Sequence, residues 1–470
     1  MLLNSMEKPH IAVIPSAGFT HLVPILEFSR RLFHLHPEFH ITCFIPSVGA
    51  PPASSKAYLQ TLPPTITSIF LTPITIEDHV ADPAILALQI ELSVSLSLPS
   101  IKQELKSLCS RAKVVALIVD VFANGALDFA KELNLLSYIY LPQSAMLLSL
   151  YFFSTKLDEI LSSESRDPQE AIVIPGCVPI LSKDLPLPFQ NLSSLGYKGF
   201  LKRSKRFHVP DGVFMNTFLE LEPGAIRAVQ EMVKGKPRVY PVGPIIQRGS
   251  IGHENGVECL TWLDKQEPKS VLYVSFGSGG TISQDQLNEL AFGLELSGQK
   301  FLWVVRAPSN LASAAYFGAE SKDPLEFLPQ GFLERTKKQG LVVPSWAPQI
   351  QVLGHSATGG FLSHCGWNSV LECVVQGVPV IAWPLFAEQS LNAAFLTDDL
   401  KVALRPTFSQ SGLAEREEIA KVVRGLMDDK EGIEIRKRME LLKIAAANAI
   451  KEDGSSTKTL SEVATSLRCF

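Results

Sequence analysis

One segment of the C-terminal half runs Gly359-Gly-Phe-Leu-Ser-His-Cys-Gly-Trp-Asn-Ser-Val-Leu-Glu-Cys-Val-Val-Gln-Gly-Val-Pro-Val-Ile-Ala-Trp383. Residues 359–362 and 380–383 are short apolar runs typical of buried strands, and the apolar stretch after the turn at 364–369 is typical of a helix. A strand, a helix and a second strand in this order make a βαβ unit, whose strands are parallel. The segment therefore predicts an α/β fold.

The same alternation continues in both directions along the chain. Residues 22–35 repeat apolar side chains at three- and four-residue spacing, as an amphipathic helix does. We expect strands at 11–14, 41–45, 66–71, 114–119 and 138–141 in the N-terminal half, and at 270–275, 301–305, 341–343, 359–362, 380–383 and 402–404 in the C-terminal half. Such a pattern predicts two parallel sheets, each covered by helices on both faces.

The length of 470 residues favours two domains of roughly 200 residues each. A stretch rich in Gly, Pro and polar residues, 235–256, separates the two sets of strands. We expect an N-terminal domain over 1–244, a linker over 245–256, a C-terminal domain over 257–450 and a final helix over 451–470 that packs back on the first domain. Two Rossmann-like, doubly wound domains would face a central cleft at the carboxyl ends of their strands, where such folds bind ligands.

Composition excludes several classes of function. The net charge of −4 and the scattered basic residues predict no nucleic-acid partner, and the basic cluster at 202–206 is interpreted as a solvated helix face. No apolar run reaches the roughly 18 residues that span a bilayer. The N-terminus is too polar for a signal peptide, and the seven cysteines include no Cys-x-x-Cys pair. These features predict a cytoplasmic protein, which we expect to be a monomer.

Several common phosphate and catalytic motifs are missing. Gly277-Ser-Gly-Gly280 follows a strand, but Ile282 stands where a dinucleotide fingerprint needs its third glycine. Pro237 after Gly235-Lys236 rules out a Walker A loop, and no Gly-x-Ser-x-Gly elbow occurs. The chain also has no Asp-x-Asp pair that would hold a divalent cation against a diphosphate. We therefore expect protein donors, and no metal, to bind any phosphate.

The turn His364-Cys-Gly-Trp-Asn-Ser369 has the parts for that task. Its glycine permits a sharp turn and close approach of a ligand, and Asn368 and Ser369 lie beside the N–H groups of a new helix. Those N–H groups and the helix dipole favour a diphosphate. An ordinary capped turn between a strand and a helix is the alternative.

The surroundings of this turn resemble a known family. Residues 346–389 begin with Trp-Ala-Pro-Gln, end with Ala-Glu-Gln and enclose the turn, as in the signature box of plant secondary-product UDP-glycosyltransferases. Further stretches, at 174–179, 216–222, 240–244, 275–280 and 327–332, are similar to the branch that contains hydroquinone and monolignol glucosyltransferases. The resemblance implies a GT-B fold, with an acceptor-binding N-terminal domain and a UDP-sugar-binding C-terminal domain.

The resemblance also implies roles in donor binding. Trp346 would stack on uracil, Ala347 and Gln349 would bind the edge of the base and ribose, and Glu372 would accept hydrogen bonds from the ribose hydroxyls. For Trp346 alone, core packing is the alternative. The residues implied for the diphosphate and the sugar are His364, Gly366, Trp367, Asn368, Ser369, Ser278, Thr20, Glu388 and Gln389. A terminal Gln in this box is typical of glucose donors, so Gln389 favours UDP-glucose.

Transfer to an alcohol or phenol requires a base, and His21 is the candidate. It follows the first strand and opens a helix whose dipole favours a neutral imidazole. Asp120 ends an apolar strand, a costly place for a carboxylate without a partner. The family pairs an Asp and a His at these positions, and the Asp would orient the imidazole. A structural His21 and an Asp120 that only caps the next helix are the alternatives.

Two departures concern the substrates. Thr20 stands where many relatives have Gly, and we interpret it as a donor-sugar contact. Gly125 stands where close relatives often have an acidic residue, which suggests a shifted acceptor preference. The candidate acceptor-pocket residues are Phe19, Phe122 and Ser144. The predicted function is inverting glucosyl transfer from UDP-glucose to a small phenol, with a silent UDP-sugar-binding regulator and a UDP-sugar epimerase or hydrolase as alternatives.

Overall fold

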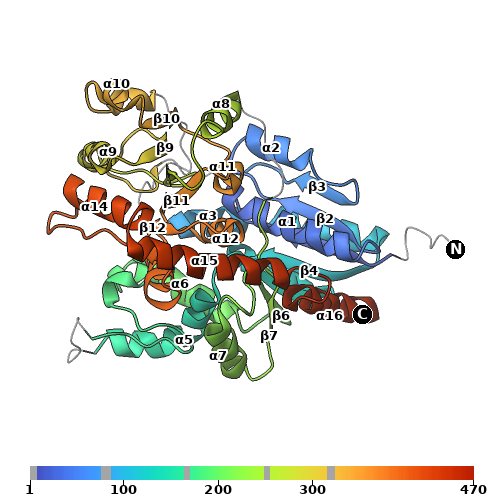
Figure 1. Ribbon diagram of the computed structural model, residues 1–470. Helices are drawn as coiled ribbons and strands as arrows, with labels where there is room; N and C mark the ends of the chain where they lie inside the picture. Colours follow the sequence, from blue (N-terminus) through green and yellow to red (C-terminus); the bar gives the residue numbers. More distant parts are fainter. Residues whose placement is uncertain (1–7, 76–85, 164–169, 248–253, 315–322) are drawn as a thin grey trace. The chain divides into compact units, whose positions relative to one another are not determined.

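A computed structural model describes residues 8–75, 86–163, 170–247, 254–314 and 323–470 (Figure 1). The chain divides into two compact units. The first comprises residues 1–179, 191–248 and 446–470, and the second comprises residues 180–190 and 249–445. No helix of the described residues is long and apolar enough to cross a membrane.

The first unit is built on a parallel sheet of seven strands, in the order β3-β2-β1-β4-β5-β6-β7. The strands are β1 (His10–Ile14), β2 (His40–Ile45), β3 (Ile66–Phe70), β4 (Val114–Asp120), β5 (Leu136–Leu141), β6 (Gly212–Met215) and β7 (Arg238–Pro241). Residues of β1 and β4 are almost all buried because helices cover both faces of the sheet. Strand order reverses between β1 and β4, which makes a doubly wound sheet.

The helices of the first unit follow the strands in βα order. They are α1 (Phe19–Leu35), α2 (Ala53–Leu59), α3 (Leu86–Arg111), α4 (Leu127–Glu132), α5 (Ala145–Leu161), α6 (Leu195–Arg206), α7 (Pro223–Val233) and α16 (Ser455–Cys469), with the short 3-10 helix η2 (Val121–Ala126) after β4. Helix α16 packs within this unit: Arg468 Nε donates to Glu38 Oε1 at 2.7 Å, and the buried Ser456 hydroxyl donates to the carbonyl of Gly243.

The second unit is built on a parallel sheet of six strands, in the order β10-β9-β8-β11-β12-β13. Its strands are β8 (Val271–Ser275), β9 (Lys300–Val305), β10 (Gly340–Pro344), β11 (Thr358–Ser363), β12 (Val380–Ala382) and β13 (Ala403–Leu404). Its core includes the fully buried rings of Trp303, Trp383 and Phe301. Strand order reverses between β8 and β11.

The helices of the second unit again alternate with the strands. They are α8 (Glu254–Leu263), α9 (Gln284–Ser297), α10 (Phe332–Thr336), α11 (Gln349–Gly354), α12 (Trp367–Gln376), α13 (Gln389–Ala394), α14 (Arg416–Met427) and the start of α15 (Lys430–Ala449), with 3-10 turns η3 (Ser182–Asp184), η4 (Leu187–Gln190) and η6 (Pro324–Phe327) and the π-helical turn η7 (Phe395–Asp399). Two parallel, doubly wound units confirm the predicted fold class.

Three local expectations differ from the structure. Residues 212–215 and 238–241 form strands β6 and β7, which the sequence did not predict, because a strand of four residues is too short to show a period. Of the expected linker at 245–256, residues 248–253 lie outside the described residues and 254–256 begin α8. Residues 180–190 leave the first unit for the second, where Leu187 N donates to Ala387 O at 3.0 Å and Arg405 binds Asp184 at 2.7 Å.

Candidate functional site

The first group of predicted site residues lies where strand order reverses in the first unit. His21 is in the first turn of α1, directly after β1, and Asp120 is the last residue of the adjacent strand β4. Because parallel strands end at the same edge of a sheet, the two side chains meet: His21 Nδ1 lies 3.0 Å from Asp120 Oδ2. Asp120 is fully buried, and 12% of the His21 side chain is exposed.

Two further donors hold the Asp120 carboxylate. The Ser16 hydroxyl donates to Oδ1, and the backbone N–H of Phe122 donates to the same oxygen at 3.1 Å. Asp120 therefore both caps η2 and pairs with His21, so the two interpretations of this carboxylate hold together. Ser16 is 1% exposed and was not among the predicted residues. Only its place two residues beyond β1 could have drawn attention to it.

The candidate acceptor residues have different surroundings. The ring of Phe122 meets His21 edge to face, with centroids 5.1 Å apart. Phe19 packs in the same manner on Tyr58 of α2, at 6.0 Å, and Thr20 lies between Phe19 and His21 in α1. Ser144 caps α5, since its hydroxyl accepts from Leu147 N at 3.1 Å. The roles of Phe19, Phe122 and Ser144 toward an acceptor, and of Thr20 toward the donor sugar, stay predictions.

The basic cluster at 202–206 is not simply a solvated face, so that interpretation is wrong for part of it. Arg203 is 2% exposed and donates to Glu91 of α3 at 2.9 Å. Arg206 donates to the carbonyl of Asn124 in η2 at 2.8 Å. Tertiary packing of α6 on α3 and η2, which no local pattern reveals, turns these two residues inward.

The second group lies where strand order reverses in the second unit. His364 follows β11, and Ser278 lies in the loop after the neighbouring strand β8. The His364 ring sits between Gly277 and Gly366, where a Cβ atom would come within 2.5 Å of it on either side. Gly277 also has a φ of +74°, so glycine is required there for both space and backbone conformation.

The His364 imidazole is neutral, and one of its ring nitrogens has no hydrogen-bond partner among the described residues. Burial lowers its pKa to about 4, which keeps it uncharged near neutral pH. Its Nδ1 is buried and has no hydrogen-bond partner among the described residues. Next to it, α12 begins at Trp367, and its N-cap residue, Gly366, provides no side-chain cap. This end of α12 therefore combines backbone N–H groups with an unused imidazole nitrogen, a suitable arrangement for an anion.

Two polar side chains of α12 and one of α11 form a connected cluster. Gln349 Nε2, at the start of α11, donates to Ser369 Oγ at 2.9 Å and to Glu372 Oε2 at 2.6 Å. Burial raises the pKa of Glu372 to about 7, and the hydrogen bond from Gln349 opposes that rise. Trp346 and Ala347 precede this cluster, Trp346 half-buried and Ala347 6% exposed. The cluster presents a carboxyl group that titrates near neutral pH.

The remaining residues predicted to bind the donor lie at the starts of α12 and α13. Gln389 opens α13 after Glu388, and its Oε1 accepts from Leu385 N at 2.8 Å and Phe386 N at 3.0 Å. Since the oxygen is occupied, the amide of Gln389 can offer only N–H groups to a ligand. Trp367 is 2% exposed and packs on Phe395, so its ring belongs to the core. Asn368, in the first turn of α12, is half-buried.

The turn before α12 is held by a residue that the sequence did not single out, Asn392 of α13. Cys365 has a φ of +63°, and Asn392 Nδ2 of α13 donates to its carbonyl at 2.9 Å. This bond ties the turn between β11 and α12 to the helix that carries Gln389. Asn392 lies in an otherwise unremarked helical stretch and had no sequence signal.

The chain is similar to known glucosyltransferases over nearly its full length. The family profile of UDP-glucoronosyl and UDP-glucosyl transferase matches residues 252–430. Hydroquinone glucosyltransferase of Rauvolfia serpentina is 49% identical over 97% of both chains. UGT2 of Phytolacca americana, complexed with UDP-2fluoro-glucose and pterostilbene, is 46% identical with a TM-score of 0.88, over 98% of this chain and 99% of that chain. A Polygonum tinctorium UDP-glucosyltransferase capable of glucosylating indoxyl, complexed with 3,4-dichloroaniline, is 45% identical with a TM-score of 0.90, over 99% and 100%.

Proposed function

Since the chain belongs to the plant family 1 UDP-glycosyltransferases and is a UDP-sugar-dependent glycosyltransferase, we propose that it transfers glucose from UDP-glucose to the hydroxyl of a small phenol. The observation that carries the proposal is the contact of His21 with the buried carboxylate of Asp120, at 3.0 Å. The named aromatic ligands and substrates of the relatives support a phenolic acceptor, such as a simple phenol, a monolignol, a flavonoid or an isoflavonoid.

The geometry of the pair supports a separate role for each ring nitrogen. Nδ1 of His21 faces a carboxylate oxygen, so it carries the proton and donates. Nε2 is then the lone-pair nitrogen that accepts the proton of the acceptor hydroxyl. Asp120, oriented by Ser16 and by the N–H of Phe122, stabilises the imidazolium that results.

The reaction is a single displacement. The acceptor oxygen attacks the anomeric carbon from the face opposite UDP, the bond from that carbon to the diphosphate oxygen breaks, and UDP departs with the electron pair. The α-linked donor thus gives a β-glucoside. His364, Ser278, Asn368, Ser369 and the N–H groups around Gly366 and Trp367 would stabilise the charge on UDP, so we propose a reaction without a metal ion.

The remaining donor contacts follow from the second unit. Trp346 would provide the stacking surface for uracil, with Ala347 and Gln349 at the edge of the base and Glu372 at the ribose. Gln389 would donate its amide N–H to a glucose hydroxyl, with Glu388 and Thr20 as further sugar contacts. The support for glucose is Gln389 itself, whose oxygen is engaged by two backbone N–H groups.

Chromatography of the products from UDP-glucose and a panel of phenols, hydroxycinnamyl alcohols, flavonoids and isoflavonoids tests the proposal. His21→Ala should lower kcat by about 10² to 10⁴-fold, the usual contribution of a general base, while UDP still binds. His34→Ala is the matched control, because His34 is an exposed residue at the other end of the same helix. Full turnover by His21→Ala, or consumption of UDP-glucose without an acceptor, would refute this mechanism.

The proposal extends to the setting of the enzyme. An odd number of cysteines without a Cys-x-x-Cys pair supports a reducing compartment, and we propose a cytoplasmic monomer. Light scattering on a sizing column measures the oligomeric state. Activity that survives dialysis against a chelator supports the metal-free reaction, and activity restored only by added Mg²⁺ or Mn²⁺ contradicts it.

A further inference from the structure

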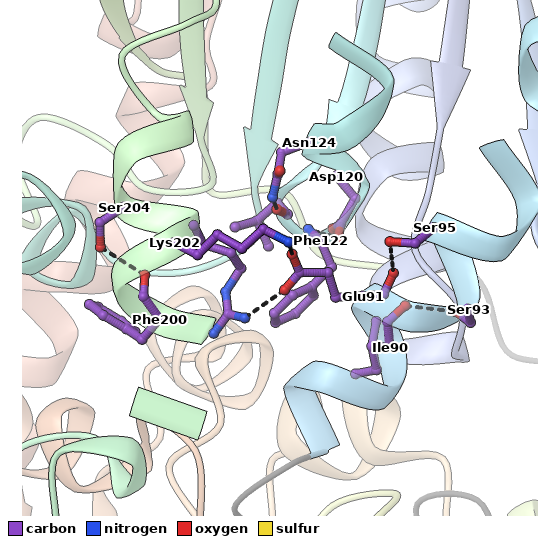
Figure 2. A network of polar contacts seen from close by, with 12 residues as sticks. Ile90, Glu91, Ser93, Ser95, Asp120, Phe122, Asn124, Phe200, Lys202 and Ser204 are labelled. Atoms are coloured by element: carbon purple, nitrogen blue, oxygen red, sulfur yellow. Dashed lines mark hydrogen bonds and ion pairs between the residues drawn. The ribbon is translucent and has the colours of Figure 1, made fainter. Parts of the chain in front are cut away.

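An ion pair between buried Arg203 and partly exposed Glu91 lies beside the Phe122 ring. Arg203 of α6 is 2% exposed, and its Nη1 donates to Glu91 Oε2 of α3 at 2.9 Å. The Lys202 ammonium lies 3.9 Å from the other carboxylate oxygen. Figure 2 shows the Glu91 carboxylate beside the Phe122 ring, with Lys202 reaching toward it from α6. Two helices distant in sequence thus meet at one aromatic ring.

Phe122 connects this ion pair to the catalytic histidine. The Arg203 guanidinium carbon lies 5.1 Å from the centroid of the Phe122 ring, a cation–π distance. The same ring meets His21 edge to face with centroids 5.1 Å apart, and the N–H of Phe122 donates to Asp120 at 3.1 Å. A single residue therefore touches the charged pair, the base and the carboxylate that orients the base.

The ion pair of Arg203 and Glu91 contributes little to the stability of the fold. Arg203 has five N–H donors, and its buried Nε has no hydrogen-bond partner among the described residues. A buried ion pair with unsatisfied donors commonly contributes less than apolar residues of the same volume would. Its cost to the fold argues that Arg203 serves to position the ring.

We propose that Arg203 is a positioning residue for catalysis, which acts through Phe122 to hold the His21 imidazole against Asp120. The inference rests on the proposed function of His21 as the base. The guanidinium, fixed by Glu91, restrains the Phe122 ring, and the ring edge restricts the imidazole to the rotamer that faces the carboxylate. Without it, His21 spends part of its time in orientations from which Nε2 does not reach the acceptor hydroxyl.

Steady-state kinetics with UDP-glucose and hydroquinone test this chain of contacts. Arg203→Met keeps the apolar stem and removes the charge, and Lys202 stays beside Glu91 as a counter-charge. We expect kcat to fall about tenfold, because the free energy of one desolvated cation–π contact corresponds to a factor of about this size. The KM for UDP-glucose should change less than about twofold. The melting temperature should fall, because Glu91 loses its buried partner and keeps only Lys202 as a counter-charge, so kcat is compared below the unfolding transition of both proteins. Lys202→Met, which removes the same charge from an exposed position of the same helix, should leave kcat unchanged.

A double-mutant cycle with Phe122→Leu shows whether the effect passes through the ring. In that background, Arg203→Met should change kcat less than about twofold, because no ring is left to position. Should Arg203→Met not fold, Arg203→Gln, which still donates to Glu91, enters the same cycle with the same expectation. An unchanged kcat in the single variant, or an equal loss in both backgrounds, would overturn the proposal. Absence of glucoside from the unmodified enzyme with every member of the phenol, hydroxycinnamyl alcohol, flavonoid and isoflavonoid panel would instead overturn the proposed function.

Discussion

The pH dependence of UDP binding tests the role proposed for Glu372. This side chain is 9% exposed, and burial raises the pKa of its carboxyl group from 4.5 to about 7. The ionised form offers both oxygens as acceptors to the two ribose hydroxyls, whereas protonation turns one of these oxygens into a donor and weakens the acceptor strength of the group. Roughly one tenth of the group is ionised at pH 6 and about nine tenths at pH 8, so UDP should bind about tenfold more tightly at pH 8.

Isothermal titration calorimetry of UDP at pH 6, 7 and 8 measures this change. The terminal phosphate of UDP also titrates, near pH 6, and would contribute to any trend. Glu372→Gln is the matched control, because it has nearly the same shape and no charge. His364 stays neutral over this range, since its pKa is about 4. The part of the pH dependence that Glu372→Gln loses belongs to the carboxylate.

The stability of the protein without UDP should respond in the opposite direction. The folded-state pKa of Glu372 lies above its unfolded value, so its stabilising contribution is complete below pH 4.5 and is lost as the pH rises through 7. The difference of about 2.5 pKa units corresponds to roughly 3 kcal/mol of unfolding free energy. Denaturant unfolding should show this loss in the unmodified protein and not in Glu372→Gln. Parallel pH profiles of the two proteins, in binding and in unfolding, would refute the assignment.

Three other substitutions probe the remaining contacts. Gly277→Ala places a Cβ about 2.5 Å from the His364 ring, at a residue whose φ is +74°, so the affinity for UDP measured by calorimetry should fall. Gly298→Ala is the control, because Gly298 has a similar φ and a Cβ there would meet no atom within 4 Å, so the affinity for UDP should not change. Ser16→Ala removes a donor from the fully buried Asp120 and should cost about 1 to 3 kcal/mol of unfolding free energy and lower kcat; unchanged values of both would contradict that contact. Gln389→Glu keeps the oxygen that binds Leu385 and Phe386 but replaces the N–H donor, so KM for UDP-glucose should rise about tenfold or more at constant melting temperature, and an unchanged KM would argue against the sugar contact.

Most of the fold was accessible from local patterns. Alternating strands and helices predicted two parallel sheets, because a helix between two strands requires a parallel crossover whatever the distant residues are. The strands missed, at 212–215 and 238–241, are four residues long and carry no distinct period. The block at 346–389 identified the family because its residues are contiguous and their spacing is preserved within one chain segment.

The pairing of His21 with Asp120 was inferred from the family resemblance and from the cost of a carboxylate at a strand end. Its physical cause is the neighbouring position of β1 and β4 in the sheet, which brings together residues far apart in the chain. Ser16 joins the same carboxylate, yet a serine after a strand is too common to predict such a contact.

Periodicity reports how each segment buries one face, and that information is local. The amino-acid order alone therefore predicted the two-sheet architecture, and the block at 346–389 indicated the family. Side-chain partners across elements depend on how helices pack and on which rotamers that packing allows. Packing alone therefore turned Arg203 inward onto Glu91 and Phe122, seated His364 between two glycines and raised the pKa of Glu372 to about 7. Desolvation and contact across distant segments arise only once the chain is folded.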